Sequence, residues 1–226
     1  MSCEGAGADD HLSLATAGIG AVQLKVKGRA SHAGNAPEAG RNALYELIYQ
    51  IMQTKDLSNP ATGVKLNWTL ANAGSVRNVI PADASATADV RVIRLQDFDG
   101  IERAVREKMS TKSIPDTEVS VVFERNRPPL EASERSLRVG AQAREIYAEV
   151  GRPLVLLEKP TGGGTDAAFA ALQTKAPVLE GFGLKTFGAH SNEREYVEVP
   201  SIEPRLYLLT RMIVGVSQGT IVLGGN

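Results

Sequence analysis

The clearest pattern in the chain is an alternation of apolar and polar residues that starts after residue 18. In the segment 22–27 every second residue is valine or leucine, as expected of a strand that buries one face. Three further segments alternate in the same way: 66–70, 86–92 and 119–123. The pattern therefore predicts four half-buried strands.

Apolar residues with helical spacing separate these strands. They recur at intervals of three and four residues from Leu44 to Ile51 and from Phe98 to Met109, which is the spacing of a helix lying on a sheet. The order strand, helix, strand, strand, helix, strand over residues 18–127 predicts a ferredoxin-like βαββαβ sandwich. Two helices cover one face of such a sheet. The other face, which carries Thr87, Asp89 and Arg91, is expected to meet solvent, a partner or a cleft.

A second region follows Pro128-Pro129, where consecutive prolines favour an extended linker. Helical patterns and short apolar strands alternate in residues 128–226, as in α/β domains. The expected elements are a helix ending at Gly151, strands at 154–157 and 177–179, a glycine loop at 161–166 that opens a helix, and a final helix around 206–216. So few strands would leave sheet edges uncovered, and we expect the rest of this domain to precede residue 1. Residues 1–17 are expected to form a loop of the same domain.

The composition narrows the class of partner. The 226 residues carry 25 basic and 26 acidic side chains, a formal charge of −1, and no basic stripe, which argues against nucleic acid as the main partner. No apolar run reaches the roughly 18 residues of a membrane span, and residues 1–10 lack the pattern of a secretory signal. The chain is therefore expected to be soluble, with a cytoplasmic location as the default. Its single cysteine, Cys3, cannot form an internal disulfide.

Histidines are the first candidates for chemistry. There are three, at positions 11, 32 and 190, too few for a site of clustered imidazoles. His32 lies in the turn Gly28-Arg29-Ala30-Ser31-His32-Ala33-Gly34, between a strand and the start of a helix, where a side chain can act outside the sheet. His190 lies in a loop of small residues. It could be a ligand or a catalytic residue, although spacing alone favours an ordinary surface histidine.

Other candidates have both a functional and an ordinary interpretation. Arg91 and the pair Arg125 and Arg127 could grip a carboxylate with two parallel hydrogen bonds, or could be solvated at a strand edge. The glycine loop 161–166 could direct backbone N–H groups at an anion, or could be a tight turn, since it lacks the Gly-Lys-Ser/Thr ending of a Walker loop. Asn78 by itself would be a turn residue.

Taken together, the motifs resemble those of one family. They are Gly28–Gly34 with Pro37-Glu38 and Asn42-Ala43; Gly74-x-x-x-Asn78-Val79-Ile80-Pro81; Ala88-Asp89-Val90-Arg91; Arg125-Asn126-Arg127-Pro128; Thr161–Ala168; and Gly188-Ala189-His190-Ser191 with Glu195-Tyr196-Val197. From about Glu4 to about Met212 the chain closely resembles the two-zinc carboxypeptidases of the glutamate carboxypeptidase (carboxypeptidase G) type. Aminoacylase, acetylornithine deacetylase and succinyl-diaminopimelate desuccinylase belong to the same superfamily.

The resemblance implies a role for each part of the chain. Residues 18–127 would form the lid, or dimerisation, domain, while 1–17 and 128–226 would be an incomplete part of the catalytic α/β domain. His32 would reach the active site of the other protomer of a homodimer and polarise the scissile carbonyl. The substrate would be a small peptide or an N-acyl amino acid. The other assignments are Asn78, Arg91, Arg127, Gly163 and Gly164 to substrate binding, and Glu4 and His190 to zinc.

Two metal-site motifs of the family do not occur in this chain. No histidine is followed two residues later by aspartate, and there is no Glu-Glu pair, so the general base and several ligands of a two-zinc centre are missing. We expect descent from a zinc-dependent enzyme that hydrolyses an amide to a C-terminal amino acid, glutamate being the leading candidate, but no hydrolysis by this chain alone. The alternative is a non-catalytic dimerisation or binding module, or subunit, derived from that family.

Overall fold

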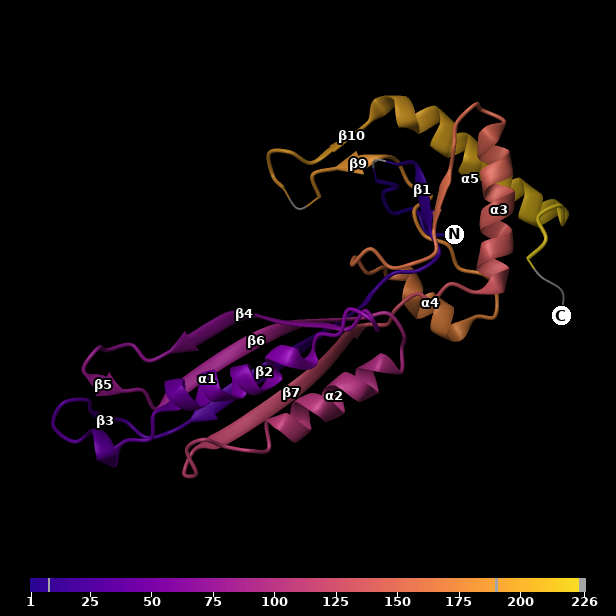
Figure 1. The fold of residues 1–226 in the computed structure, drawn as a ribbon. Coiled ribbons are helices and arrows are strands. Elements are labelled where there is room, and N and C mark those ends of the chain that lie inside the picture. The colour runs from indigo at the N-terminus through magenta and orange to yellow at the C-terminus, as the bar shows by residue number, and fades with distance from the viewer. Residues whose placement is uncertain (8, 190, 224–226) are drawn as a thin grey trace. The chain divides into compact units, whose positions relative to one another are not determined.

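The computed structural model describes residues 1–7, 9–189 and 191–223. Its contacts divide the chain into two compact units, each with its own core. We call Gly18–Pro128 the sandwich unit, and Met1–Ala17 together with Pro129–Asn226 the split unit. Figure 1 shows both as ribbons.

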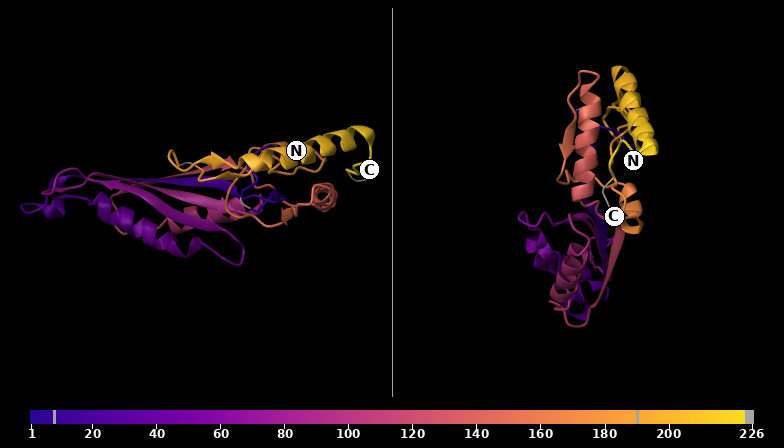
Figure 2. Two further views of the ribbon diagram at one scale, coloured as in Figure 1. Left: turned by 90° about the horizontal axis from the view of Figure 1, so that it is seen from above. Right: turned by 90° about the vertical axis from the view of Figure 1, so that its right-hand side faces the viewer.

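The sandwich unit is an antiparallel sheet with two helices on one face (Figures 1 and 2). Across the sheet the strands lie in the order β4-β6-β2-β7. The prediction of a ferredoxin-like βαββαβ fold is confirmed. The bounds are β2 (Gly18–Lys27), α1 (Ala43–Thr54), β4 (Lys65–Ala73), β6 (Asp83–Val92), α2 (Asp97–Lys108) and β7 (Glu118–Arg127).

Alternation explains how these strands form a core. In β2 and β6 every second side chain is buried, and the buried sets face the helices. Leu47 of α1 and Phe98 of α2 pack onto them. Asn42 starts α1, because its side-chain oxygen accepts hydrogen bonds from the backbone N–H groups of Leu44 (3.0 Å) and Tyr45 (3.2 Å) and so satisfies two N–H groups of the first helical turn.

A β-bulge in β4 changes the outcome at one predicted position. The alternation predicted Leu66, Trp68 and Leu70 on the same face of the strand. Trp68 pairs with Ala88 and Leu70 with the adjacent Thr87, so one extra residue is inserted in β4 and Leu70 turns to the opposite face. Leu70 is 63% exposed, and this part of the prediction is wrong.

The connections after β2 and β4 meet in a second, small sheet. β3 (Ser31–His32) pairs antiparallel with β5 (Val79–Ile80). Gly28 is required where the chain leaves β2, because a Cβ atom there would lie 2.0 Å from the carbonyl oxygen of Arg41. Two short 3-10 helices flank α1: η1 (Pro37–Ala39) and η2 (Lys55–Leu57).

The split unit combines short strands with three helices. β1 (His11–Ser13) and β8 (Val155–Leu157) are parallel, and β9 (Thr186–Phe187) and β10 (Tyr196–Val197) are antiparallel. The core lies where α3 and α5 meet the β1 segment, and it includes Leu12, Tyr147 and Leu208. The remaining bounds are α3 (Glu134–Ala148), α4 (Ala167–Gln173), η3 (Val199–Ser201) and α5 (Ile202–Gln218).

Two predictions for the split unit are wrong. Residues 1–17 are not entirely loop, because His11–Ser13 form β1. Residues 177–179 do not form a strand. Instead Leu179 accepts one backbone hydrogen bond from Ser2 (2.9 Å), and Glu180 forms an isolated antiparallel bridge with Ser13. Pairings this short, between segments this distant in sequence, leave no periodic signal.

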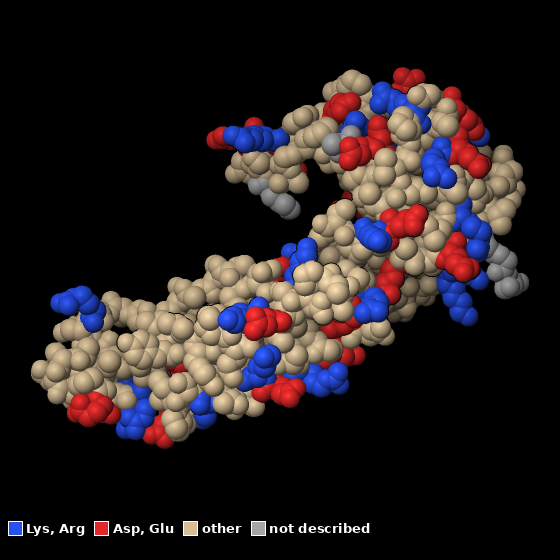
Figure 3. Space-filling view, in the orientation of Figure 1, with Lys and Arg blue, Asp and Glu red and all other residues tan. Residues whose placement is uncertain are grey.

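On the face of the molecule drawn in Figure 3, charge is not strongly segregated among the described residues. Figure 3 shows acidic and basic side chains interspersed over the described residues of the visible face, without an extended area of one sign. None of the helices in the described ranges is both long and apolar enough to cross a bilayer.

Candidate functional site

His32 lies in the small β3–β5 sheet with its side chain exposed. Its Nδ1 accepts hydrogen bonds from the backbone N–H groups of Gly34 and Asn35, both at 3.1 Å. In a neutral imidazole whose Nδ1 is an acceptor, the proton is on Nε2. The turn therefore selects the tautomer in which Nε2–H can donate a hydrogen bond to an external carbonyl oxygen.

The same small sheet brings Asn78 next to His32. Val79 is the strand partner of His32, and the N–H of Ala33 donates to the carbonyl oxygen of Asn78 at 2.9 Å. The side chain of Asn78 is exposed. Two residues that are far apart in the sequence thus share one polar surface, which we call the His32 tip (residues 31–35 and 78–80).

Arg91 and Arg127 lie in one row across the main sheet. Arg91 of β6 and Arg127 of β7 are both strand partners of Ile19 in β2. Directly opposed residues project from the same face of a sheet, and this face is the one that the helices do not cover, since the adjacent Val90 points into the core. With strands about 4.8 Å apart, the two Cα atoms are roughly 10 Å apart.

The guanidinium of Arg91 is oriented by Asp89 on the same strand. Nε donates to Oδ2 at 2.8 Å and Nη2 to Oδ1 at 3.0 Å. Such a two-bond contact fixes the plane of the guanidinium. Arg91 is therefore held in a defined orientation on the open face.

Arg125, the third arginine considered, faces the other way. It is the strand partner of Gly20 and pairs with Asp99 (2.7 Å) and Glu102 (2.9 Å) of α2. The hydrogen bond from Arg125 is the main reason that the pKa of Glu102 is lowered. A β-bulge between the partners of Ile19 and Gly20 separates Arg125 from Arg127. Arg125 therefore has the ordinary interpretation, a surface arginine that forms ion pairs.

The arginine row and the His32 tip lie at opposite ends of the sandwich unit. Ile19 is near the start of β2, and the chain reaches the tip only after the ten residues of that strand. At about 3.3 Å per residue the strand spans roughly 30 Å. A substrate of the size of a dipeptide cannot contact both groups within one chain.

The glycine loop, residues 161–166, connects β8 to α4. Gly162 has φ +119°, which a residue with a side chain rarely adopts. Gly163 is exposed, and its carbonyl oxygen accepts a hydrogen bond from the N–H of Ala17 at 2.8 Å. Within the described part of the chain, no acceptor is bonded to the N–H of Gly163 or Gly164.

Of the two predicted zinc ligands, one lies in the described part of the chain. Glu4 is exposed, and its carbonyl oxygen accepts a hydrogen bond from the N–H of Gly183 (2.9 Å), in the segment that leads towards residue 190. His190 itself lies outside the described residues. The residues that are described contain no group of three or more histidine, cysteine, aspartate or glutamate side chains placed to hold a metal ion.

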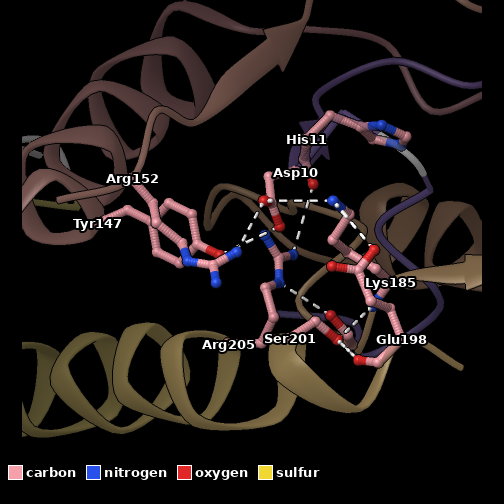
Figure 4. Close-up of polar contacts among 9 residues, drawn as sticks. Asp10, His11, Tyr147, Arg152, Lys185, Glu198, Ser201 and Arg205 are labelled. Carbon is pink, nitrogen blue, oxygen red and sulfur yellow. Dashed lines mark hydrogen bonds and ion pairs between the residues drawn. The ribbon is translucent and has the colours of Figure 1, made fainter. Parts of the chain in front are cut away.

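A buried polar network in the split unit was not predicted from the sequence (Figure 4). Asp10, Tyr147 and Arg205 are its buried centre. The hydroxyl of Tyr147 donates to Oδ1 of Asp10 at 3.1 Å, and the guanidinium of Arg205 lies 5.6 Å from the centre of the Tyr147 ring. Arg205 also donates to the backbone carbonyl oxygens of Gly183, Gly181 and His11. Four segments distant in sequence, around residues 10–11, 147, 181–183 and 205, are thereby joined.

Burial explains the protonation properties of this network. It raises the pKa of the Tyr147 hydroxyl, with a further contribution from the negative charge of Asp10, and it lowers the pKa of the Arg205 guanidinium. Burial is also the main reason that the pKa of the His11 imidazole is lowered. Helical spacing could have identified Arg205, because Arg205, Leu208 and Met212 follow one another at i, i+3 and i+7 on the buried stripe of α5.

Comparison with protein families and curated sequences identifies relatives. Residues 14–117 match the family model described as the peptidase dimerisation domain of the M20 type. Carboxypeptidase G2 of Pseudomonas sp. (strain RS-16) is 44% identical over 211 residues, which is 93% of this chain and 50% of that protein. A homolog of a p-aminobenzoyl-glutamate hydrolase subunit, from Haemophilus influenzae, is 32% identical over 90 residues, 39% of this chain and 19% of that protein. The chain thus spans about half the length of carboxypeptidase G2, and its match to the Haemophilus protein covers a smaller share of that protein.

Solved structures show the same fold at low identity. The aminopeptidase PepT of Bacillus cereus superposes with a TM-score of 0.78 at 18% identity, covering 95% of this chain and 56% of that one. A dinuclear metal binding peptidase of the M20 family from Bacillus subtilis superposes with a TM-score of 0.66 at 13% identity, covering 96% of this chain and 56% of that one.

Proposed function

Because this chain carries the M20 peptidase dimerisation domain and is a homologue of carboxypeptidase G2, we propose that it is the dimerisation and substrate-binding part of a zinc-dependent carboxypeptidase or amidohydrolase. The reaction is hydrolysis of an amide bond to a C-terminal amino acid. Glutamate is the leading candidate for that amino acid, and the name of the Haemophilus relative, which refers to p-aminobenzoyl-glutamate hydrolase, supports it.

The observation that carries the proposal is the separation of the arginine row from the His32 tip. Arg91 and Arg127 are suited to a carboxylate, since guanidinium groups bind it through paired, charged hydrogen bonds. His32 is suited to the scissile carbonyl, because a fixed Nε2–H donor stabilises negative charge that develops on its oxygen. One small substrate can use both groups only if they come from different protomers, with Asn78 assisting His32 in trans.

The described residues do not by themselves provide the donors of a two-zinc centre. Glu4 and His190 are two candidates, and a pair of metal ions needs more ligands and a base to activate water. The described residues offer no three-donor group to add to them. We therefore propose that residues outside this chain complete the metal site, and that the chain alone does not hydrolyse substrate.

A chimera tests this proposal. The chain is joined to the half of carboxypeptidase G2 that it does not match, and glutamate release from p-aminobenzoyl-glutamate is measured with and without a chelator. We expect hydrolysis that the chelator abolishes, and none from the 226-residue chain. Zinc-dependent hydrolysis by the chain itself, lost in His190→Ala, would contradict the second expectation, and an inactive chimera that binds zinc would contradict the first.

The same lack of a three-donor group among the described residues favours a second candidate, a non-catalytic dimerisation or binding module. Zinc stoichiometry and molecular mass distinguish the two. Zinc bound tightly at one or more per chain supports a surviving part of the metal site. A dimer that binds no zinc supports the module.

The sandwich unit has an apolar surface suited to self-association. Tyr45, Ile48 and Met52 follow one another along α1 and are 66%, 49% and 52% exposed. β4 is an edge strand of the sheet and carries the outward-turned Leu70. An unpaired edge strand can add a strand from a second copy. We propose that α1 and β4 form the homodimer contact.

We expect Ile48→Lys to convert the dimer to a monomer at micromolar concentration, because it places a charge in the centre of the apolar contact. Sedimentation velocity measures the change. Val122→Lys is the matched control, since Val122 is similarly exposed (53%) but lies on β7, at the other edge of the sheet. If Val122→Lys dissociates the dimer and Ile48→Lys does not, the dimer contact lies at the β7 edge and the proposal is wrong.

A further inference from the structure

The glycine loop is attached to the core by a buried threonine and a buried glutamate. Thr165 is 1% exposed and Glu180 is 6% exposed. The Thr165 hydroxyl donates to Oε2 of Glu180 and accepts a hydrogen bond from the N–H of Ala167 at 3.0 Å. A hydroxyl has one proton and an ionised carboxylate only accepts, so the direction of both bonds is fixed. The end of the loop and the first residue of α4 therefore depend on the same hydroxyl.

Glu180 is itself held on several sides. Its backbone exchanges two hydrogen bonds with Ser13, at 2.8 and 2.9 Å, and its Oε1 accepts from the N–H of Gly181 at 3.1 Å. Gly181 has φ +92°, which keeps a side chain out of this position. The carboxylate that receives the Thr165 hydroxyl therefore has a fixed place next to β1.

The loop has a second attachment on its other side, the hydrogen bond from the N–H of Ala17 to the carbonyl oxygen of Gly163 (2.8 Å). Gly163 and Gly164 lie between this attachment and Thr165. The carbonyl group of Gly163 and the N–H of Gly164 belong to one planar peptide unit, so this bond also fixes the direction of the Gly164 N–H. The Cα of Gly163 is open to solvent, and neither its N–H nor that of Gly164 has an acceptor among the described residues, so both can meet a ligand. Two successive N–H groups of this kind suit a carboxylate.

From this geometry we propose that Glu180 is a positioning residue for carboxylate binding: acting through Thr165, it holds the N–H groups of Gly163 and Gly164 in the arrangement that receives the carboxylate of the substrate. The inference rests on the proposed function, because it assigns a support to the substrate-binding loop of that function. A carboxylate suits this task because a charged acceptor makes a stronger hydrogen bond with the hydroxyl than a neutral acceptor does.

The test uses the full chain labelled with nitrogen-15 and glutamate as the probe. The amide resonances of Gly163 and Gly164 are followed during the titration in the wild type and in three variants. Thr165→Val removes the hydroxyl at constant shape, Thr165→Ser keeps the hydroxyl, and Glu180→Gln replaces one accepting oxygen by a donor. We expect the wild type and Thr165→Ser to bind equally, and Thr165→Val and Glu180→Gln to bind roughly tenfold more weakly, the effect of losing one hydrogen bond of ordinary strength.

The control for folding is the set of amide resonances from β1 and β8. If these have the same positions in a variant as in the wild type, weaker glutamate binding by that variant is not caused by unfolding. If Thr165→Val unfolds the split unit, Glu180→Gln decides the question, because it preserves volume. Wild-type affinity in both variants, failure of Thr165→Ser to bind like the wild type, or glycine amides that do not respond to glutamate would each overturn the proposal. The readout needs neither metal nor turnover, so an inactive chimera would count against the proposed function without affecting this result.

Discussion

Replacing Arg205 by alanine is expected to destabilise the split unit by about 3 kcal/mol, the usual cost of removing one partner from a buried charged network. The guanidinium, which is 1% exposed, donates to three backbone carbonyl oxygens and packs on the Tyr147 ring. Without it, three carbonyl groups lose a charged donor, and the Asp10 carboxylate, which keeps its ion pairs with Lys185 (3.7 Å) and Arg152 (3.8 Å), loses one nearby positive charge. Few single substitutions in this unit should have a larger effect.

The two units can be followed separately in one urea titration. The chain has one tryptophan, Trp68, and it lies in the sandwich unit, so its fluorescence reports that unit alone. Far-ultraviolet circular dichroism reports both. In Arg205→Ala we expect an early dichroism transition that the fluorescence does not follow. Arg211→Ala is the control: Arg211 lies on the same helix and also packs over a tyrosine, but its partner Glu149 is at the surface. An unchanged dichroism transition in Arg205→Ala would show that the network does not stabilise the unit.

Regular periodicity made the sandwich unit predictable. β2 and β6 are ten residues long with a buried residue at every second position, and the two helices carry apolar stripes. The pattern failed at Ile48 of α1, which is 49% exposed although its spacing placed it on the stripe that faces the sheet, and at Leu70, where the extra residue of a bulge exchanges the two faces of the strand. Nothing in the local sequence distinguishes a regular strand from a bulged one, because the register depends on the partner strand.

The split unit was less predictable because its strands are short and pair with segments that are distant in the sequence. β1 has three residues, and its partner β8 follows more than a hundred residues later. The candidate site shows the same division. Asn78 and His32 could be identified from their motifs. They lie side by side, however, only because the two-residue strands β3 and β5 pair with each other. Glu180 carries no motif, and its role depends on Thr165, which it meets only in the folded chain.

Complementation between two inactive variants can establish which protomer supplies His32 to each active site. In the chimera, His32→Ala is expected to lower kcat by roughly 100- to 1000-fold, the loss typical of one oxyanion donor. His190→Ala is expected to inactivate through the metal site. If His32 acts in trans, a dimer that pairs a His32→Ala protomer with a His190→Ala protomer has one complete site, because the first protomer keeps His190 and receives His32 from the second.

Mixing the two inactive variants, unfolding them together and refolding them should therefore restore about a quarter of the wild-type activity, since half of the dimers are mixed and each has one working site of two. If His32 acted within its own protomer, every site in the mixture would lack one of the two histidines and no activity would return. The reverse control combines the double variant with an equal amount of wild type. There the trans arrangement lowers the activity of the wild-type protomers by about half, because half of them pair with a protomer that supplies no His32. The cis arrangement would leave their activity unchanged, so the two experiments give opposite results for the two models.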